Sequence, residues 1–492
     1  MPKPDRQVDS SVWQSAHWRR LDTALWCYFF LPVVIFLLGF FIPSIGVPAA
    51  LVAVAAAVYW LPRGIPPIRG LHHARGDAGA SLCLLAILSA IWAMLGGAGH
   101  TFHANAFDWI PRFAVLRDLV VQDWPPRYVD ASGRDLILRA PLGYYLPPAW
   151  LARKLGLAWA DAILLVWTWL GITLFFAANL GGTAVRNLAG AALFVCASGL
   201  DLVGVWLAGG PPWLGGHLEW WAGRIQYSST TTLLFWVPNH ALPGWIAAAW
   251  LWRFRDDPRF VARLPVLFLP VMLWSPLPAI GLLPLAMVAA WVHWRRGSVQ
   301  WAGCFKSLLL VAPAAGLVAA YLLMGVGAIN AGIGAASPAQ SAVELGIDIW
   351  RNIVFLMLEA GLFGMLALQR NRSPLMIASL VVLAALPWFS FGPNNDLAMR
   401  GSIPALTILW LVLIAELTAR PAQRALSSLM RSVLAMLFLL GMATPFQEIY
   451  RALTGAPWAA DTSLSAPAAL RSFPPHYFAS PNDSALRHVF RN

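Results

Sequence analysis

The chain has 492 residues, of which 59% are hydrophobic and 11% charged, with a mean hydropathy of +0.64 and a formal net charge of +12. So little polar surface cannot cover so much apolar mass in water, which excludes an ordinary soluble protein and makes the bilayer the expected solvent. No basic block stands apart from the apolar runs, so nucleic acid is not an expected partner.

Arginine supplies nearly all of the positive charge, because the only lysines among the 34 basic residues are Lys3, Lys154 and Lys306. A guanidinium group can bind two phosphate oxygens at once, so this bias suits partners that carry phosphate. High-GC codon usage gives the same enrichment without any function. Both explanations stay open at this point.

Twelve apolar runs are long enough to span a bilayer. They lie at 24–43, 46–62, 80–97, 159–178, 186–208, 230–252, 264–293, 307–326, 350–368, 374–391, 401–418 and 427–445. Run 264–293 has basic connections on both sides, and Pro276, Pro278, Gly281 and Pro284 in its middle predict a turn between two short helices. The sequence therefore predicts an all-α integral membrane protein with about 13 transmembrane helices.

Arginines in the short connections predict the orientation, because cytoplasmic loops are enriched in Arg and Lys. The connections assigned to the inside carry Arg63, Arg69, Arg75, Arg186, Arg253, Arg255, Arg259, Arg263, Arg295, Arg296, Lys306, Arg370, Arg372, Arg420, Arg424 and Arg431. The outside then holds 98–158, 209–229, 275–281, 327–349, 392–400 and a tail. We expect a polytopic domain over 1–445 and an extracytoplasmic tail over 446–492, in a bacterial inner membrane with the amino terminus in the cytoplasm.

The outer loop 98–158 is too long for a passive connection. Asp108 can cap a helix that runs to about Val121, with one apolar face made by Trp109, Phe113, Leu116 and Val120. A second segment, 141–156, places aromatic residues beside Arg153 and Lys154, a composition typical of helices that lie in the membrane interface. Two juxtamembrane helices are therefore expected.

An acidic residue in a large outer loop, flanked by two juxtamembrane helices in a many-span protein with a helical hairpin, resembles the GT-C superfamily of membrane glycosyltransferases. More narrowly, the chain is similar to bacterial membrane proteins labelled glycosyltransferase-like, and the likeness covers most of it. The segments that carry it are DWIPRFAVLRDLV, WPPRY, APLGYYLPPAWLARKLG, FWVPNHALPGW, LWSPLPAIGLLPL and NNDLAMRGSIPAL. The resemblance implies a GT-C-like fold and a sugar donor linked to polyprenyl phosphate.

In the GT-C pattern the loop aspartate is the general base, and Asp108 is the candidate here. A carboxylate within hydrogen-bond reach of an acceptor hydroxyl contributes about 10²–10⁴-fold to the rate. The structural alternative is a helix cap. His100 and His103 are three residues apart, so they could share a helical face and bind a sugar, or hold a divalent metal with Asp108. No other cofactor is indicated.

Polar residues inside the apolar runs are further candidates, because ionisable groups at membrane depth line polar cavities or pair with each other. They are Asp201, Asn239, His240 and Glu359. Prolines on both sides of His240 would open its helix and free backbone carbonyls. Each of these residues could bind substrate or could form a structural hydrogen-bonded pair, and the sequence does not decide between the two roles.

Two outer arginines could neutralise the phosphate of a leaving donor. Arg224 lies in EWWAGRIQYSS, and Arg400 follows Asn394, Asn395 and Asp396, which could bind sugar hydroxyls. Contact with lipid headgroups is the alternative for each arginine.

These features predict an enzyme that moves a sugar from a polyprenyl-phosphate lipid to a saccharide or lipid acceptor on the periplasmic or external face, in contact with membrane lipids. One rival function is a transporter or flippase for lipid-linked saccharides, with His240 and Glu359 as its site. A polymerase or ligase of surface polysaccharide is another.

Overall fold

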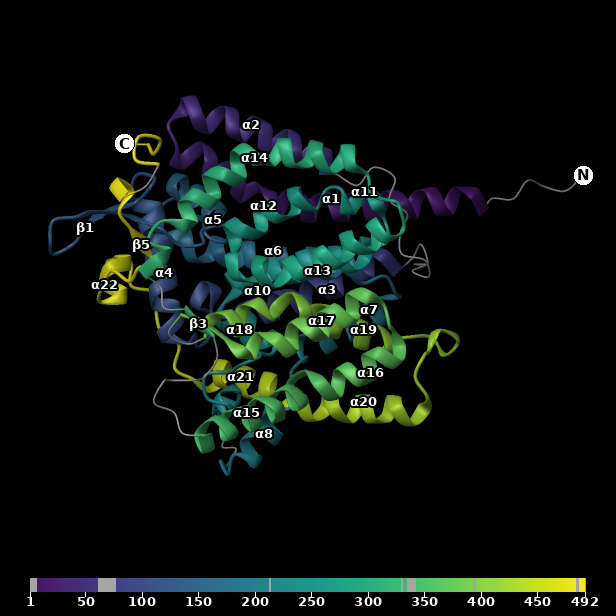
Figure 1. The fold of residues 1–492 in the computed structure, drawn as a ribbon. Coiled ribbons are helices and arrows are strands. Elements are labelled where there is room, and N and C mark those ends of the chain that lie inside the picture. Colours follow the sequence, from purple (N-terminus) through teal and green to yellow (C-terminus); the bar gives the residue numbers. More distant parts are fainter. Residues whose placement is uncertain are drawn as a thin grey trace, which may run out of the picture.

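The computed structural model describes residues 7–60, 77–211, 214–328, 331–333, 342–392, 395–483 and 486–491. These residues form mainly helices, many of which run side by side along one direction (Figure 1). Nine helices in these ranges are long and apolar enough to cross a membrane. Three further apolar helices are shorter, so the all-α membrane architecture stands and the total of about 13 spans stays a prediction.

The apolar helices of the bundle, long and short, account for most of the predicted runs. In chain order they are α1 (Gln7–Phe40), α2 (Pro43–Trp60), α3 (Asp77–Leu95), α6 (Ala160–Asn179), α7 (Ala184–Val195), α10 (Pro238–Phe254), α12 (Leu264–Trp274), α13 (Pro276–Arg295), α14 (Trp301–Leu323), α15 (Ala342–Leu356), α16 (Leu362–Arg370), α17 (Pro374–Ala385), α19 (Ile403–Leu417) and α20 (Ser428–Gly441). A π-helical turn over Met357–Gly361 joins α15 to α16.

Three of the predicted runs are interrupted. Run 186–208 divides into α7 and the short α8 (Asp201–Leu207), and run 230–252 divides into α9 (Thr230–Trp236) and α10. Run 264–293 breaks at Ser275, whose extended backbone (φ −166°, ψ 111°) is what a following proline favours. The imidazole Nε2 of His293, near the end of α13, donates to the carbonyl of Arg255 at 2.9 Å. The chain thus returns to the end of the bundle it left, as a hairpin requires.

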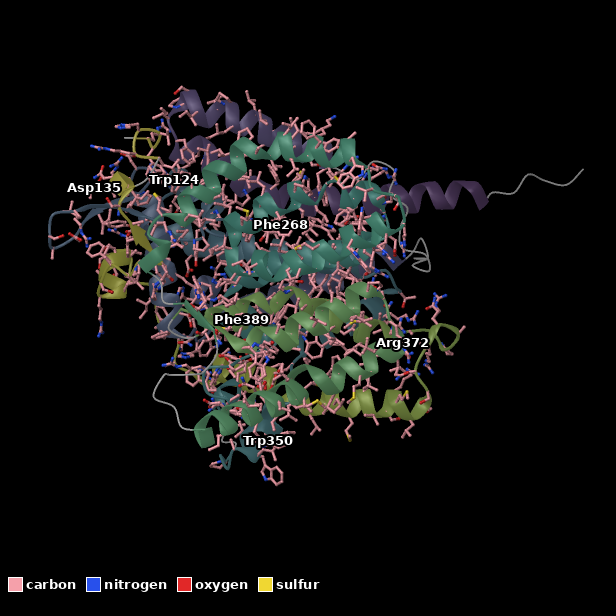
Figure 2. All side chains as sticks on the ribbon, in the orientation of Figure 1. Trp124, Asp135, Phe268, Trp350, Arg372 and Phe389 are labelled. Carbon is pink, nitrogen blue, oxygen red and sulfur yellow. The ribbon has the colours of Figure 1, made fainter. Side chains whose placement is uncertain are left out.

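Loops at the two ends of the bundle differ in composition. One end carries the connection with α11 (Pro258–Val261) and Arg372, and the other carries Trp124 and Asp135 (Figures 1 and 2). At the arginine-rich end, Asp22 binds Arg253 at 2.8 Å and Glu416 binds Arg370. The predicted connection with Arg63, Arg69 and Arg75 lies outside the described residues.

The opposite end of the bundle is covered by loop 98–158 and the tail. The loop contains α4 (Ala106–Val121), β1 (Arg127–Val129), β2 (Asp135–Leu138) and α5 (Leu146–Leu155). The tail strand β5 (Phe478–Ala479) pairs with β2, and α22 (Ala466–Leu470) packs on α4. Nearby, β3 (Ala331–Ile333) pairs with β4 (Phe389–Phe391). These short strands are absent from the sequence-based expectation.

Helix α4 ends at Val121 as predicted, but its apolar face is buried inside the protein. Trp109, Phe113, Leu116 and Val120 are all buried, and α4 contacts α5 and α22. Helix α21 (Ala443–Thr454) is continuous across residue 446, where the sequence placed the start of the tail, and that boundary stays a prediction. The tail then covers α4: Trp458 donates its indole N–H to the carbonyl of Ala104 at 2.9 Å.

The close crossing of α13 over α18 (Asp396–Gly401) depends on glycine. A Cβ atom at Gly281 would lie 1.8 Å from the carbonyl oxygen of Gly401. We expect Gly281→Ala to lower the free energy of unfolding by about 1–3 kcal/mol, because the two backbones must separate. Thermal unfolding of the detergent-solubilised protein measures this change.

Gly316→Ala in α14 is the matched control, since no heavy atom lies within 4 Å of the added Cβ. It should be neutral or raise the stability by up to about 1 kcal/mol, because alanine favours a helix over glycine. Equal melting temperatures for both variants would contradict the tight crossing.

Candidate functional site

Asp108 lies in the first turn of α4, with its carboxylate held by an arginine. Asn105 is the N-cap, because its side chain accepts a hydrogen bond from the Phe107 amide at 3.0 Å. The capping role considered for Asp108 is therefore wrong. Its Oδ1 binds Arg112 Nη2 at 2.9 Å, and 18% of the side chain is exposed. No hydrogen bond to Oδ2 occurs within the described structure, so this oxygen can receive a ligand.

A chain of hydrogen bonds leads from Arg112 into the bundle. Arg112 donates to Asn239 Oδ1 at 2.9 Å, which fixes the amide orientation and makes Asn239 Nδ2 a donor to His240 Nε2 at 3.2 Å. His240 Nδ1 must then carry the proton and donate to Ser275 Oγ. His240 is therefore a neutral bridge between α10 and the hairpin.

Helix breaks put these polar groups in one place. Pro238 begins α10 and Pro276 begins α13. The backbone N–H of a first helical residue has no partner within the helix, so proline, which lacks this N–H, is tolerated there at no loss of a hydrogen bond. Asn239 and His240 consequently lie in a first helical turn, and Ser275 lies at the break. The amino ends of α4, α10 and α13 thus meet at this network, and helix amino ends favour negatively charged ligands.

Arg400 belongs to the same site. It binds Asp396 at 3.1 Å across one turn of α18, and it interacts electrostatically with His240, as Arg112 does. Asn395 precedes α18 with a left-handed backbone (φ 52°), which asparagine tolerates, and its buried Oδ1 has no hydrogen-bond partner. The structure therefore brings Asp108, His240 and Arg400 together.

The tail and β2 add residues to this site. The Arg139 amide donates to the Tyr477 carbonyl at 2.7 Å, and Tyr477 also interacts electrostatically with Arg112. Burial lowers the pKa of His476, and the positive charges of Arg400 and Arg139 lower it further against the opposing effect of Asp396. His476 therefore interacts electrostatically with Asp396, Arg400 and Arg139.

The three arginines are incompletely paired although they are largely buried. Arg112 Nε, Arg400 Nε, and both Nε and Nη2 of Arg139 have no hydrogen-bond partner. Burial lowers the pKa of Arg139, because a buried cation loses its hydration. Asp108 and Asp396 are the carboxylates paired with this set, so three cations face two anions and one positive charge remains. Unpaired buried charge is unfavourable, and an oxyanion would satisfy these donors.

His100 and His103 do not share a helical face. Gly97 and Gly99 have positive φ, which ends helical geometry there. His100 Nδ1 binds Asp161 at 2.7 Å, while His103 Nδ1 binds the carbonyl of Ala456 at 2.7 Å. Within the described ranges no group of three or more His, Cys, Asp or Glu side chains could hold a metal ion. The proposed His100, His103 and Asp108 metal set is therefore corrected: these residues form separate contacts.

Arg224 remains apart from the network. It is exposed in the connection between α8 and α9, and none of the hydrogen bonds or ion pairs described here joins it to Asp108 or Arg400. Of the two arginines considered for phosphate, Arg400 is the one that interacts electrostatically with His240, as Arg112 does.

Glu359 and Asp201 form a second polar cluster. Glu359 lies in the π-helical turn, and its carboxyl group interacts with that of Asp201. Trp221 donates its indole N–H to Glu359 Oε1 at 3.3 Å, and Thr444 donates to Asp201 at 2.8 Å. Gly199 makes room for this carboxyl group, because a Cβ there would lie 1.7 Å from Glu359 Oε2. In the described structure neither Glu359 nor Asp201 forms a hydrogen bond or ion pair with His240.

Next to that pair, the connection between α8 and α9 contributes His217 and Glu219. His217 Nδ1 binds Glu448 at 2.9 Å, and Glu219 accepts from the Ser229 amide at 2.9 Å. Burial raises the pKa of Glu219 to about 7. Arg451 also binds Glu448, at 3.0 Å, whereas Asp201, Glu219 and Glu359 form no ion pair with a basic side chain in the described residues.

Several residues of the candidate site escaped sequence reasoning. Arg112 lies one helical turn after Asp108, a spacing that signals an ion pair, and Arg139 follows an apolar segment immediately before APLGYY. His476 and Tyr477 lie in PPHYF, where no local pattern indicates chemistry. Tertiary contacts alone bring the last two to the site.

No protein-family model, curated protein or solved structure matches this chain.

Proposed function

We infer that the chain is a membrane glycosyltransferase of GT-C type, which moves a sugar from a polyprenyl-phosphate donor to a saccharide or lipid acceptor. In this proposal the site opens on the periplasmic or external face of a bacterial inner membrane. The observation that carries it is the set of unpartnered guanidinium N–H groups of Arg112, Arg139 and Arg400, together with the partly exposed carboxylate of Asp108 that Arg112 holds.

The arrangement suits the chemistry of glycosyl transfer. Asp108 Oδ2 would take the proton of the acceptor hydroxyl while the acceptor oxygen forms a bond to the anomeric carbon. The bond from that carbon to the phosphate oxygen breaks, and its electron pair leaves with the phosphate. Arg139 and Arg400 would stabilise this negative charge, since donors already fixed in place need no reorganisation.

Asn395 and Asp396 are positioned for a further role beside Arg400. The unpartnered Oδ1 of Asn395 can accept a hydrogen bond from a sugar hydroxyl. His240 would act through Asn239 and Arg112 as a positioning residue, because Asn239 and Ser275 hold its two ring nitrogens. His100 would position α4 from behind, through its ring contact with Trp109.

Transport of lipid-linked saccharides is the rival function, and the buried Glu359–Asp201 pair is the observation that favours it. His240 and Glu359 lie in separate hydrogen-bond networks among the described residues, and a transport site shared by both stays a prediction. A polymerase or ligase would share the donor chemistry and differ in the acceptor.

A reconstituted assay separates catalysis from transport. Purified protein in vesicles would receive radiolabelled polyprenyl-phosphate sugars extracted from bacterial membranes, together with extracted acceptors. We expect each transferred sugar to release one polyprenyl phosphate. Movement of intact lipid-linked sugar across the vesicle membrane, with no release of polyprenyl phosphate, would overturn the proposal.

A further inference from the structure

A large apolar groove opens on the side of the bundle, between α1, α5 and α6. Its volume is about 900 Å³. Two parallel stripes line it, each with the i, i+3, i+4, i+7 spacing of one helix face. On α1 they are Leu31, Val34, Ile35 and Leu38, and on α6 they are Ile163, Val166, Trp167 and Leu170.

Side chains of both stripes are exposed on the outer surface of the bundle. Leu31 is 43% exposed and Val166 is 55% exposed, although both lie in the middle of candidate membrane spans. In a bilayer such a surface faces hydrocarbon, and a concave one can hold a lipid chain along its length.

The groove has a polar end at the mouth of loop 98–158. Arg153, Asp123 and Arg491 line it there, beside Trp124, which marks this end in Figure 2. Next to the mouth, Lys154 lies 4.0 Å from the centre of the Trp150 ring. Two arginines and one carboxylate therefore line this end of the groove, with Lys154 next to it, and an anionic headgroup complements the remaining positive charge.

This polar end is distinct from the candidate catalytic site. Arg153 donates to the carbonyl of Leu119 at 3.3 Å, near the carboxyl end of α4. Asp108 lies near the amino end of the same helix, eleven residues earlier, so roughly 16 Å separate the two positions along the helix axis. A lipid whose phosphate lies at Arg153 therefore cannot react at Asp108.

We propose that this groove binds an anionic phospholipid of the surrounding membrane, with one acyl chain between the α1 and α6 stripes and its phosphate at Arg153 and Arg491. The bilayer supplies such a ligand laterally, without passage through water. The lipid fills space between α5 and the bundle, and its phosphate neutralises the excess positive charge at the mouth. The inference does not depend on the proposed glycosyl transfer.

Native mass spectrometry of the detergent-purified full chain tests this binding, with added phosphatidylglycerol and phosphatidylcholine as probes. Arg491→Gln removes one cation whose side chain forms no described hydrogen bond, and should weaken phosphatidylglycerol binding about fivefold. Val166→Trp fills the groove from an exposed position and should abolish the bound lipid. Phosphatidylcholine should bind more weakly to the wild type than phosphatidylglycerol.

Two matched variants control for nonspecific effects. Arg487→Gln removes an exposed tail arginine outside the groove, and Met287→Trp adds the same bulk at an exposed position of α13. Both should retain the lipid. Binding that survives Val166→Trp and Arg491→Gln would overturn the proposal. So would displacement of phosphatidylglycerol by equimolar polyprenyl phosphate, which would assign the groove to the donor chain instead.

Discussion

Asp108→Asn is expected to lower sugar transfer by about 10²–10⁴-fold while the protein stays folded, because the amide cannot accept the proton of the acceptor hydroxyl. The amide oxygen can still receive the hydrogen bond from Arg112, so the network to Asn239 and His240 remains. The measurements are the rate of transfer from labelled polyprenyl-phosphate sugar and the thermal unfolding of the same preparation.

Asp135→Asn is the control, since Asp135 lies in the same loop and forms an exposed ion pair with Arg127, which contributes little to stability. It should leave transfer unchanged. Glu359→Gln separates catalysis from transport. If transfer or lipid movement depends on Glu359 and His240 while Asp108→Asn is fully active, Asp108 is not the base and transport gains support.

Arg139→Gln is expected to lower sugar transfer by about 10²–10³-fold, because one preorganised donor to the leaving phosphate is lost. It should also weaken the binding of polyprenyl phosphate, while the binding of the uncharged polyprenol is unchanged. Equilibrium binding to both lipids measures this difference directly. A merely structural arginine would not distinguish the phosphorylated lipid from the alcohol.

The thermal stability of Arg139→Gln gives a second readout. Two of its guanidinium nitrogens are buried without partners, so removing the charge should leave the melting temperature unchanged or raise it. Arg224→Gln, at an exposed position away from the network, is the matched control and should bind both lipids like the wild type. Strong unfolding of Arg139→Gln, or equal losses in both arginine variants, would contradict the assignment.

The order of the helices and the division of the loops between two ends can be predicted from the sequence. A bilayer demands apolar runs of a fixed length, and arginines collect in the loops on one side, so both signals are local in the chain. The break at Ser275 is also local, because Pro276 follows it. The burial of α4 cannot be predicted from a local signal, because the apolar face that contains Trp109 and Phe113 suits a membrane interface as well as a protein core.

The sequence by itself determined a helical membrane protein and offered Asp108, His240 and Arg400 as separate candidates. Tertiary structure decided that these three converge, that Arg139 and His476 join them, and that Arg224 and Glu359 do not. The physical reason is that the site forms where α4, two proline-started helices, α18 and the tail meet. Each contributes one or two polar groups, and no local pattern encodes contacts between segments so far apart in the chain.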